Sequence, residues 1–347
     1  LLIFILIVEK VFTIIHKDKK TKARIGVLKT KKGKIETPFF MPVATKAAAK
    51  HINSEALTRL GAKAIISNAF LLSIKPGVKI IKKLGGLGKF MNFSGMNFTD
   101  SGGFQMYSPS IYLSSNEHGV FFKNPFSGEK IFMTPEKDME IQLNIGSNVA
   151  MCLDRMPLYE DSKQEIEKAV NLTTQWAKRC KQHHDKLQKN LSKSKHQLLF
   201  GITQGGIYED LRENSAKELI KLNFDGYSIG GFGMGETFNE EMKIVKQQKS
   251  ILPENKPIYL MGIGNPVEIL EAISYGVDIF DSRMPTQSAR RGTLFTSKGK
   301  LKILNKKYAE DKTPIDKNCR CFACKNYTKA YIRFLLKEKE PVGKELA

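Results

Sequence analysis

The segment LLFGITQGGIYEDLRENSAKELIKLNFDGYSIGG, residues 198–231, decides the fold. An apolar run covers Leu198–Gln204, an amphipathic helical pattern covers Asp210–Lys221, and a second apolar run covers Gly226–Gly230. Short apolar runs that end in polar residues or glycine predict buried strands. A strand, a helix and a second strand in this order predict two parallel strands joined by a right-handed crossover.

The same alternation continues on both sides of this unit. Further strands are expected at Ala64–Asn68, Val149–Asp154, Ile258–Gly262 and Val277–Asp281, and further helices at Asp161–His184, Phe238–Lys249 and Pro266–Tyr275. Two α/β architectures fit, a (β/α)8 TIM barrel and an open doubly wound sheet. Many of these strands end in polar residues or glycines, namely Asp154, Gln204, Gly230–Gly231 and Asp281. A barrel collects such residues from many strands on one face, whereas an open sheet gathers its site at one switch point, so the barrel is favoured.

The flanks of the repeat suggest separate elements. Apolar runs within residues 11–43 surround a basic, glycine-containing stretch and predict an N-terminal antiparallel β-hairpin region. The apolar run Leu1–Val8 is too short to span a bilayer. We therefore expect residues 1–10 to be an apolar extension of unknown role, and residues 11–300 to be the barrel with its hairpin region.

The charge of the chain favours a polyanionic partner. The 347 residues include 56 Lys and Arg against 35 Asp and Glu, a net charge of +21. Such an excess suits nucleic acid, because each neutralised phosphate releases counterions; a solvated basic surface is the alternative. No stretch is long and apolar enough to suggest a membrane span, so we expect a cytoplasmic protein with no membrane partner.

Three of the five cysteines form a CxCxxC cluster, Cys319, Cys321 and Cys324. This spacing brings three thiolates within reach of one ion and predicts a structural Zn²⁺ site rather than three free thiols. Structural zinc takes four ligands, and none of the six histidines lies after the cluster. Either a distant residue supplies the fourth ligand or the chain as given ends before it.

Two groups of residues could carry chemistry. The string Asp100-Ser-Gly-Gly-Phe-Gln105 combines a carboxylate, a hydroxyl and an aromatic with two glycines that allow close approach of a ligand. Asp281 ends a strand beside a loop with Arg283, Arg290 and Arg291, which suits a nucleophile acting on a nucleotide sugar. Each group also has a purely structural interpretation, a capped tight turn in the first case and an Asp–Arg ion pair in the second.

Taken together, these strings resemble the tRNA-guanine transglycosylase family, the bacterial type in particular, from about Phe12 to the C-terminus. The markers are Thr37–Pro42, Ser67-Asn68 with Lys75–Gly77, Asp100–Gln105, Gly201–Gly206, Asp225–Gly231, Tyr259–Gly262, Phe280-Asp281 and the cysteine cluster followed by Asn326-Tyr327. The resemblance implies a pentosyltransferase with a (β/α)8 barrel and a role in queuosine biosynthesis. It implies that residues 301–347 are a zinc-binding subdomain that returns to the barrel, and that the fourth zinc ligand, a histidine, lies just beyond Ala347 in a chain that is truncated as given. It also implies a homodimer that exchanges guanine at the wobble position of G-U-N tRNAs for a 7-deazaguanine, with the 7-aminomethyl form expected first.

The resemblance further assigns roles to residues of this chain. Asp281 is implied as the nucleophile that forms a covalent ester with the ribose, and Asp100 as the general acid and base. The implied base-binding residues are Asp100, Ser101, Gly102, Gly103, Phe104, Asp154, Gln204, Gly230, Gly231, Phe232 and Met261, with Glu236 steadying the loop around Phe232. The implied tRNA-contacting residues are Gly262, Ile263, Gly264, Asn265, Pro266, Val267, Thr286, Gln287, Ser288, Ala289 and Arg290.

Some positions depart from the family pattern. Gln287 stands where Arg is usual, Arg155-Met156 where Glu-Cys is usual, and Phe70–Leu72 where Tyr-His-Leu is usual. Positions 155, 156, 233 and 234 are expected to read the 7-substituent of the base, so the choice of base stays open. Three other readings also remain: a metal-dependent barrel hydrolase that uses Asp100, Asp154 and Asp281 as ligands, a non-catalytic partner subunit, and a zinc-dependent RNA-binding module.

Overall fold

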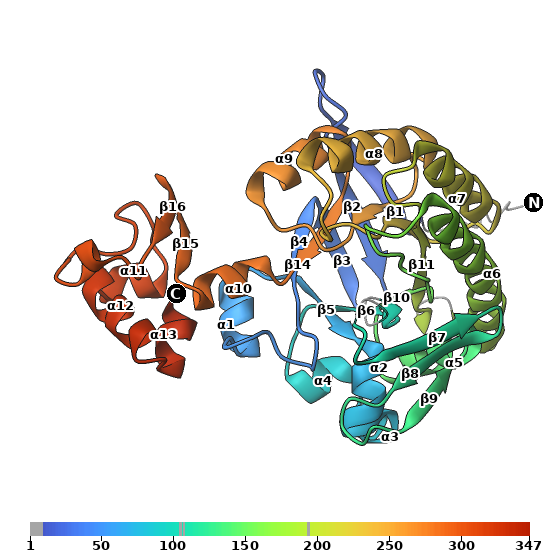
Figure 1. Ribbon diagram of the computed structural model, residues 1–347, viewed down its shortest axis with the longest axis horizontal. Coiled ribbons are helices and arrows are strands. Elements are labelled where there is room, and N and C mark those ends of the chain that lie inside the picture. The colour runs from blue at the N-terminus through green and yellow to red at the C-terminus, as the bar shows by residue number, and fades with distance from the viewer. Residues whose placement is uncertain (1–9, 104–105, 107, 193–194) are drawn as a thin grey trace, which may run out of the picture.

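Eight parallel strands form a barrel in a computed structural model that describes residues 10–103, 106, 108–192 and 195–347 (Figure 1). In sequence order they are β4 (Phe39–Pro42), β5 (Ala64–Asn68), β6 (Met96–Asp100), β10 (Val149–Met151), β11 (Leu198–Thr203), β12 (Gly226–Ile229), β13 (Ile258–Leu260) and β14 (Ile279–Ser282). A parallel bridge between Val43 and Ile66 closes the ring between the first two strands. The expected TIM-like α/β barrel is confirmed.

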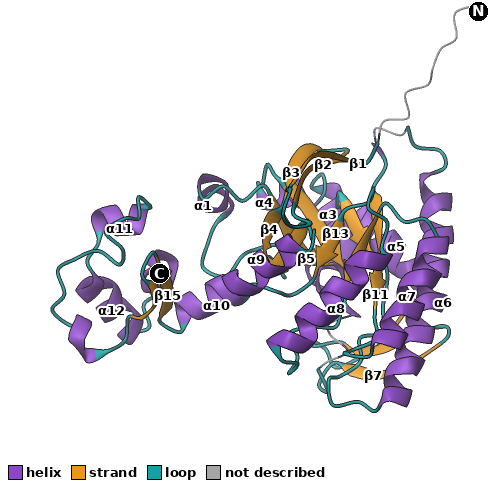
Figure 2. Ribbon diagram, turned by 90° about the horizontal axis from the view of Figure 1, so that it is seen from above, coloured by secondary structure: helices purple, strands orange, loops and turns teal. Residues whose placement is uncertain are grey.

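Helices cover the outside of the barrel (Figure 2). They are α1 (Ser54–Arg59), α2 (Ala69–Leu72), the π-helical turn η1 (Ser73–Gly77), α3 (Val78–Lys83), α4 (Leu87–Met91), α5 (Pro135–Asn144), α6 (Lys163–Gln188), α7 (Glu209–Lys221), α8 (Phe238–Ile251) and α9 (Pro266–Ser274). Local sequence sets their first residues; for example, Thr237 and Glu240 form a reciprocal capping box at the start of α8. No helix in the described ranges is long and apolar enough to cross a membrane.

Two small three-stranded antiparallel sheets were not predicted in this form from the sequence. The expected hairpin region is a three-stranded sheet of β1 (Phe12–Lys17), β2 (Arg24–Thr30) and β3 (Gly33–Thr37). A second sheet, β7 (Tyr112–Asn116), β8 (Gly119–Lys123) and β9 (Lys130–Met133), is inserted between β6 and α5 and was not anticipated. Its strands are short and mostly half-exposed, so they lack the apolar runs that identified the barrel strands.

The first sheet closes the amino-terminal end of the barrel. Phe12, Leu28 and Ile35 from this sheet share one buried cluster with the side chains that fill the barrel interior. The Arg24 side chain binds both carboxylate oxygens of Asp278, at 2.9 and 2.5 Å, immediately before β14. With that end sealed by an apolar plug and a buried ion pair, the carboxyl ends of the strands form the open end of the barrel.

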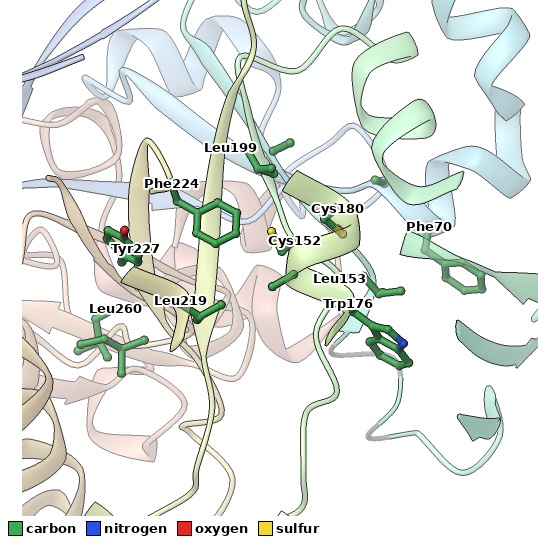
Figure 3. Close-up of a cluster of buried hydrophobic side chains, with 14 of the residues drawn as sticks. Phe70, Cys152, Leu153, Trp176, Cys180, Leu199, Leu219, Phe224, Tyr227 and Leu260 are labelled. Carbon is green, nitrogen blue, oxygen red and sulfur yellow. The ribbon is translucent and has the colours of Figure 1, made fainter. Parts of the chain in front are cut away.

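The larger part of the core lies between the strands and the helices (Figure 3). Tyr227 and Leu260 point outward from β12 and β13, and Leu219 of α7 and Trp176 of α6 pack in the same cluster. The interior cluster instead contains Phe98, whose ring meets those of Phe200 and Tyr259 edge to face. Because strand side chains alternate between the two clusters, each strand has a defined inward-facing set.

The C-terminal part of the chain has a small core of its own. It contains α10 (Met284–Arg290), β15 (Thr293–Thr296), β16 (Gly299–Lys302), the 3-10 turn η4 (Lys306–Tyr308), α11 (Phe322–Asn326), α12 (Lys329–Lys337) and α13 (Pro341–Leu346). Leu294, Ile303, Ala323, Ile332 and Leu336 form its buried cluster. In Figure 1 this part stands beside the barrel and is connected to it through α10.

Candidate active site

The alternation of strand side chains explains which residues meet at the open end of the barrel. Phe98, Ile202 and Ile279 belong to the interior cluster. Residues two positions further along the chain face the same way. Asp100, Gln204 and Asp281 therefore lie one layer above this cluster, together with Asn68 of β5 and Met261, which packs against the interior side chains. The strand ends thus supply one layer of mainly polar groups.

Asp281 is held through one of its two carboxylate oxygens. Its Oδ1 atom accepts hydrogen bonds from the Tyr259 hydroxyl at 2.5 Å and from the Gly262 amide at 2.9 Å. Burial raises the pKa of Asp281, and these two donors oppose that rise. Within the described part of the chain the other oxygen, Oδ2, has no hydrogen-bond partner. The carboxylate is therefore fixed in orientation while one oxygen stays available.

Asp100 is a carboxyl group that holds its proton at neutral pH. Its Oδ1 atom accepts hydrogen bonds from the Asn68 side chain at 2.6 Å and from the Gly102 amide at 2.9 Å. Loss of hydration raises the pKa of Asp100 to about 8, and the negative charges of Asp281 and Asp154 add to the rise. A group with this pKa can donate or accept a proton near neutral pH.

Asp154 completes the cluster of carboxyl groups. It follows β10, and it accepts a hydrogen bond from the Gln204 side chain at 2.6 Å and a longer one from Ser101 at 3.5 Å. Burial raises its pKa to about 6. A Cβ atom at Gly103 would stand 2.1 Å from the Asp154 carboxylate. The second glycine of this turn therefore keeps the space in which Asp154 lies.

The loop after β12 packs against a buried arginine, Arg212. Gly231 has a φ of 77°, which favours glycine, and the Glu236 carboxylate accepts hydrogen bonds from the amides of Gly233 and Met234. The Phe232 ring lies 4.5 Å from the guanidinium carbon of the fully buried Arg212. Burial lowers the pKa of Arg212 to about 9. Arg212 was not predicted as a site residue, because it lies in the first turn of an amphipathic helix, α7, among other charged residues.

The remaining expected site residues are distributed as follows. Phe104 lies outside the described residues. Gly262–Asn265 lie between β13 and α9, with the Ile263 side chain buried, and Pro266 and the exposed Val267 begin α9. Thr286–Arg290 lie in α10. The guanidinium carbon of Arg155, a residue expected near the 7-substituent, lies 4.9 Å from the centre of the Tyr112 ring. Its charge is thus directed toward the inserted sheet.

Two further residues of the site, Asn68 and Tyr259, were not predicted as site residues from the sequence. Asn68 contacts Asp100, and Tyr259 contacts Asp281. Period-two spacing could have identified both, because Asn68 stands two residues after the inward-facing Ile66 and Tyr259 two residues before Met261.

The cysteine cluster forms the one group of three or more Cys, His, Asp or Glu side chains, among the described residues, that could hold a metal ion. The sulfur atoms of Cys319, Cys321 and Cys324 lie within 4.8 Å of one another. Zn–S bonds of about 2.3 Å place tetrahedral thiolates about 3.8 Å apart, so the set fits one such ion. Among the described residues, the carboxylates at the strand ends do not meet this criterion.

Comparison with known proteins gives one consistent family. A family model described as queuine tRNA-ribosyltransferase matches residues 18–347. A queuine tRNA-ribosyltransferase of Thermoanaerobacter sp. (strain X514) is 47% identical over 336 residues, which cover 97% of this chain and 88% of the relative. Relatives of the same name from Lysinibacillus sphaericus (strain C3-41) and Staphylococcus aureus (strain JH9) are each 45% identical and cover 96% and 94% of this chain, and 85% and 84% of their own lengths.

Proposed function

Because the chain belongs to the queuine tRNA-ribosyltransferase family, a family of pentosyltransferases, we propose that it replaces guanine in tRNA by a 7-deazaguanine through a covalent bond between Asp281 and the ribose. The target is the wobble guanine of G-U-N tRNAs, and the enzyme works in the cytoplasm, where tRNA is found. The observation that carries the proposal is the pair formed by Asp281, with one oxygen held and one available, and Asp100, which keeps its proton.

The first half of the reaction breaks the bond to guanine. Asp281 Oδ2 forms a bond to C1′ of the ribose while the C1′–N9 bond breaks, and its electron pair leaves with guanine. Asp100 supplies the proton that the departing base takes up. The donors on Asp281 Oδ1, Tyr259 and Gly262, keep Oδ2 directed to the ribose throughout.

The second half reverses these roles. The incoming base gives the proton of its ring N–H to Asp100, its nitrogen bonds to C1′, and the ester bond to Asp281 breaks. A carboxyl with a pKa of about 8 suits both directions, because it is neither a strong acid nor a strong base at neutral pH.

The base is recognised at its polar edge. Asp154 accepts hydrogen bonds from ring and amino N–H groups, while Gln204, Ser101 and the Gly231 amide bind the neighbouring positions. Met261 covers one face of the ring, as in other sites that hold a base outside its stack. The other face is assigned to Phe104 by the family resemblance alone. With Arg155 turned toward Tyr112, the 7-substituent meets the loop around Phe232, and we propose 7-aminomethyl-7-deazaguanine as the base.

A structural zinc ion is proposed at Cys319, Cys321 and Cys324, where it cross-links the small C-terminal core and takes no part in the reaction. Contacts to tRNA are proposed at Gly262–Val267 and Thr286–Arg290, with residues 11–300 forming the catalytic unit.

The exposed aromatic side chains Phe322, Tyr331 and Phe334 lie on the C-terminal part, and we propose that they contact a second copy in a homodimer. Light scattering after size exclusion measures this directly; a monomer at micromolar concentration contradicts it.

Labelled guanine tests the enzyme class. The wild-type protein is expected to incorporate it into a G-U-N tRNA and not into the same tRNA with adenine at the wobble position. Asp281→Asn is expected to abolish exchange and the denaturant-stable protein–RNA adduct, whereas an adduct of unchanged yield in this variant contradicts the proposed nucleophile. Competition by each 7-deazaguanine against guanine then identifies the preferred base.

A further inference from the structure

An exposed ring at the tip of the inserted sheet is flanked by two lysines from the rim of the barrel. Phe126 lies in the turn between β8 and β9 and is 49% exposed. The Lys46 Nζ atom lies 5.2 Å from the centre of its ring, and the Lys75 Nζ atom lies 5.3 Å from it. Both lysines are themselves exposed. Three segments that are distant in the sequence thus converge on one ring.

The turn presents this ring in a fixed position. The Asn124 side chain accepts hydrogen bonds from the amides of Phe126 and Ser127, and its backbone pairs with Gly128 and Glu129. The Glu129 carboxylate is engaged by the Ser127 hydroxyl at 2.9 Å. The ring is therefore held by the turn itself and does not depend on the lysines for its orientation.

The two ammonium groups have no acidic partner. Neither Lys46 nor Lys75 forms an ion pair with any carboxylate in the part of the chain that the structure describes. Two like charges directed at one ring repel each other, and the attraction of an exposed ring for a cation is worth only about 0.5–1 kcal/mol. An anion placed between the lysines would remove this repulsion. The two positive charges are therefore suited to binding an anionic ligand.

The two lysines lie on segments that begin beside the residues that hold Asp100. Lys46 follows Thr45, whose carbonyl accepts a hydrogen bond from the Asn68 amide at 3.2 Å, and the Asn68 side chain contacts Asp100. Lys75 lies in η1, which follows β5 and α2. Both lysines therefore belong to segments that leave the carboxyl ends of neighbouring barrel strands, on the side where the target nucleotide is proposed to enter.

We propose that Phe126, Lys46 and Lys75 form a contact for the substrate RNA outside the base pocket, where an unpaired nucleotide near the target stacks on the ring and its phosphates pair with the lysines. The inference rests on the proposed tRNA substrate. Single-stranded RNA is recognised by this combination of an aromatic surface and nearby cations. Removing one base from the stack for reaction leaves its neighbours unstacked, and Phe126 offers one of them a replacement surface.

Binding of a fluorescent G-U-N anticodon stem–loop tests the ring. Phe126→Ala is expected to raise its Kd and the KM for tRNA about tenfold, at the weaker end of base–aromatic stacking. Phe126→Tyr keeps the ring and is expected to restore both values. The KM for guanine should stay unchanged in both variants, because the base pocket is untouched.

The dependence on salt tests the lysines. Lys46→Gln with Lys75→Gln is expected to reduce the slope of log Kd against log salt by about 0.7–0.9 per lysine. Lys19→Gln with Lys20→Gln, in the exposed turn at the closed end of the barrel, removes the same charge and is the matched control; its slope should equal that of the wild type.

Three results overturn the proposal. An unchanged Kd in Phe126→Ala, or an equal loss of slope in the control, excludes a local RNA contact. A lower melting temperature with an equal rise in the KM for guanine assigns the cluster to holding the inserted sheet in place. Failure of the wild type to exchange guanine contradicts the proposed function instead, and stem–loop binding still tests the contact in that case.

Discussion

The hydrogen bond between Tyr259 and Asp281 makes a sharp prediction about the pH dependence of the reaction. Tyr259→Phe removes only the hydroxyl that donates to Asp281 Oδ1 at 2.5 Å, in a site where Tyr259 is fully buried. A hydrogen bond to a charged group is worth about 1.5–3 kcal/mol, and one pKa unit corresponds to about 1.36 kcal/mol. The variant should therefore raise the pKa of Asp281 by about one to two units.

The sign of the effect follows from the two protonation states that the reaction needs. Asp281 must be ionised, so the rate rises as pH increases through its pKa, and Asp100 must be protonated in the first step, so the rate falls above about pH 8. In Tyr259→Phe the acid limb of the profile of kcat/KM should move upward by about one to two pH units while the alkaline limb stays. The profile becomes narrower, and its maximum becomes lower.

The assay is labelled-guanine exchange at subsaturating tRNA between pH 5 and 9. Tyr227→Phe is the matched control, because Tyr227 is equally buried but faces the helices and does not contact Asp281. An acid limb that is unmoved in Tyr259→Phe, or equally moved in the control, refutes the role of the hydrogen bond. A uniform loss of rate at every pH indicates misplacement of Asp281 rather than a change in its ionisation.

Three other changes have expected outcomes. Asp100→Asn should abolish exchange but stabilise the fold at pH 8. The folded-state pKa of Asp100, about 8, lies above its ordinary value of 3.8. The contribution of Asp100 to the stability of the wild type is therefore present below about pH 4 and is lost as pH rises toward 8. Its free energy of unfolding should exceed that of the wild type by about 1–3 kcal/mol at pH 8 and match it near pH 4 in denaturant titrations, and a less stable variant at pH 8 contradicts this. Gly103→Ala should raise the KM for guanine at least about tenfold, because the new Cβ would stand 2.1 Å from the Asp154 carboxylate; an unchanged KM means that Asp154 does not bind the base. Cys321→Ser should release bound metal and lower the melting temperature with kcat preserved below it, and full metal content by elemental analysis would count against the site.

The barrel could be predicted because its strands are buried on both faces. Such strands appear in the sequence as continuous apolar runs, and Ala64–Asn68 was located to the residue. Expected strands such as Val149–Asp154 and Ile258–Gly262 extended past the ends of β10 and β13. Cys152 and Met261 each still donate a backbone hydrogen bond to the neighbouring strand, and the regular pairing stops after them. The overestimated ends are the places where the site residues lie.

The inserted sheet and the support of the site could not be predicted, for a different physical reason. Residues 112–133 form strands that are exposed on one side and carry no long apolar run. Arg212 looks like a solvated residue in a helix with mixed charge, and only the fold shows it buried beneath Phe232. Contacts between distant segments, such as that of Lys46 with Phe126, have no local signature at all.

The string Asp278-Ile-Phe-Asp281 shows how the fold separates two chemically identical groups. Both carboxylates are buried and lie at opposite ends of β14, with raised pKa values caused mainly by burial. Asp278 binds the Arg24 guanidinium through both oxygens, so its charge is neutralised and its reactivity is suppressed. Asp281 receives only the neutral donors Tyr259 and Gly262, both on one oxygen, so no cation neutralises it within the described residues and its second oxygen stays available. The sequence alone could not distinguish them, because the partner of Asp278 lies on β2, more than two hundred residues away. The end of the strand at which each carboxylate lies, sealed by the N-terminal sheet or at the open end of the barrel, therefore separates a structural carboxylate from the proposed nucleophile.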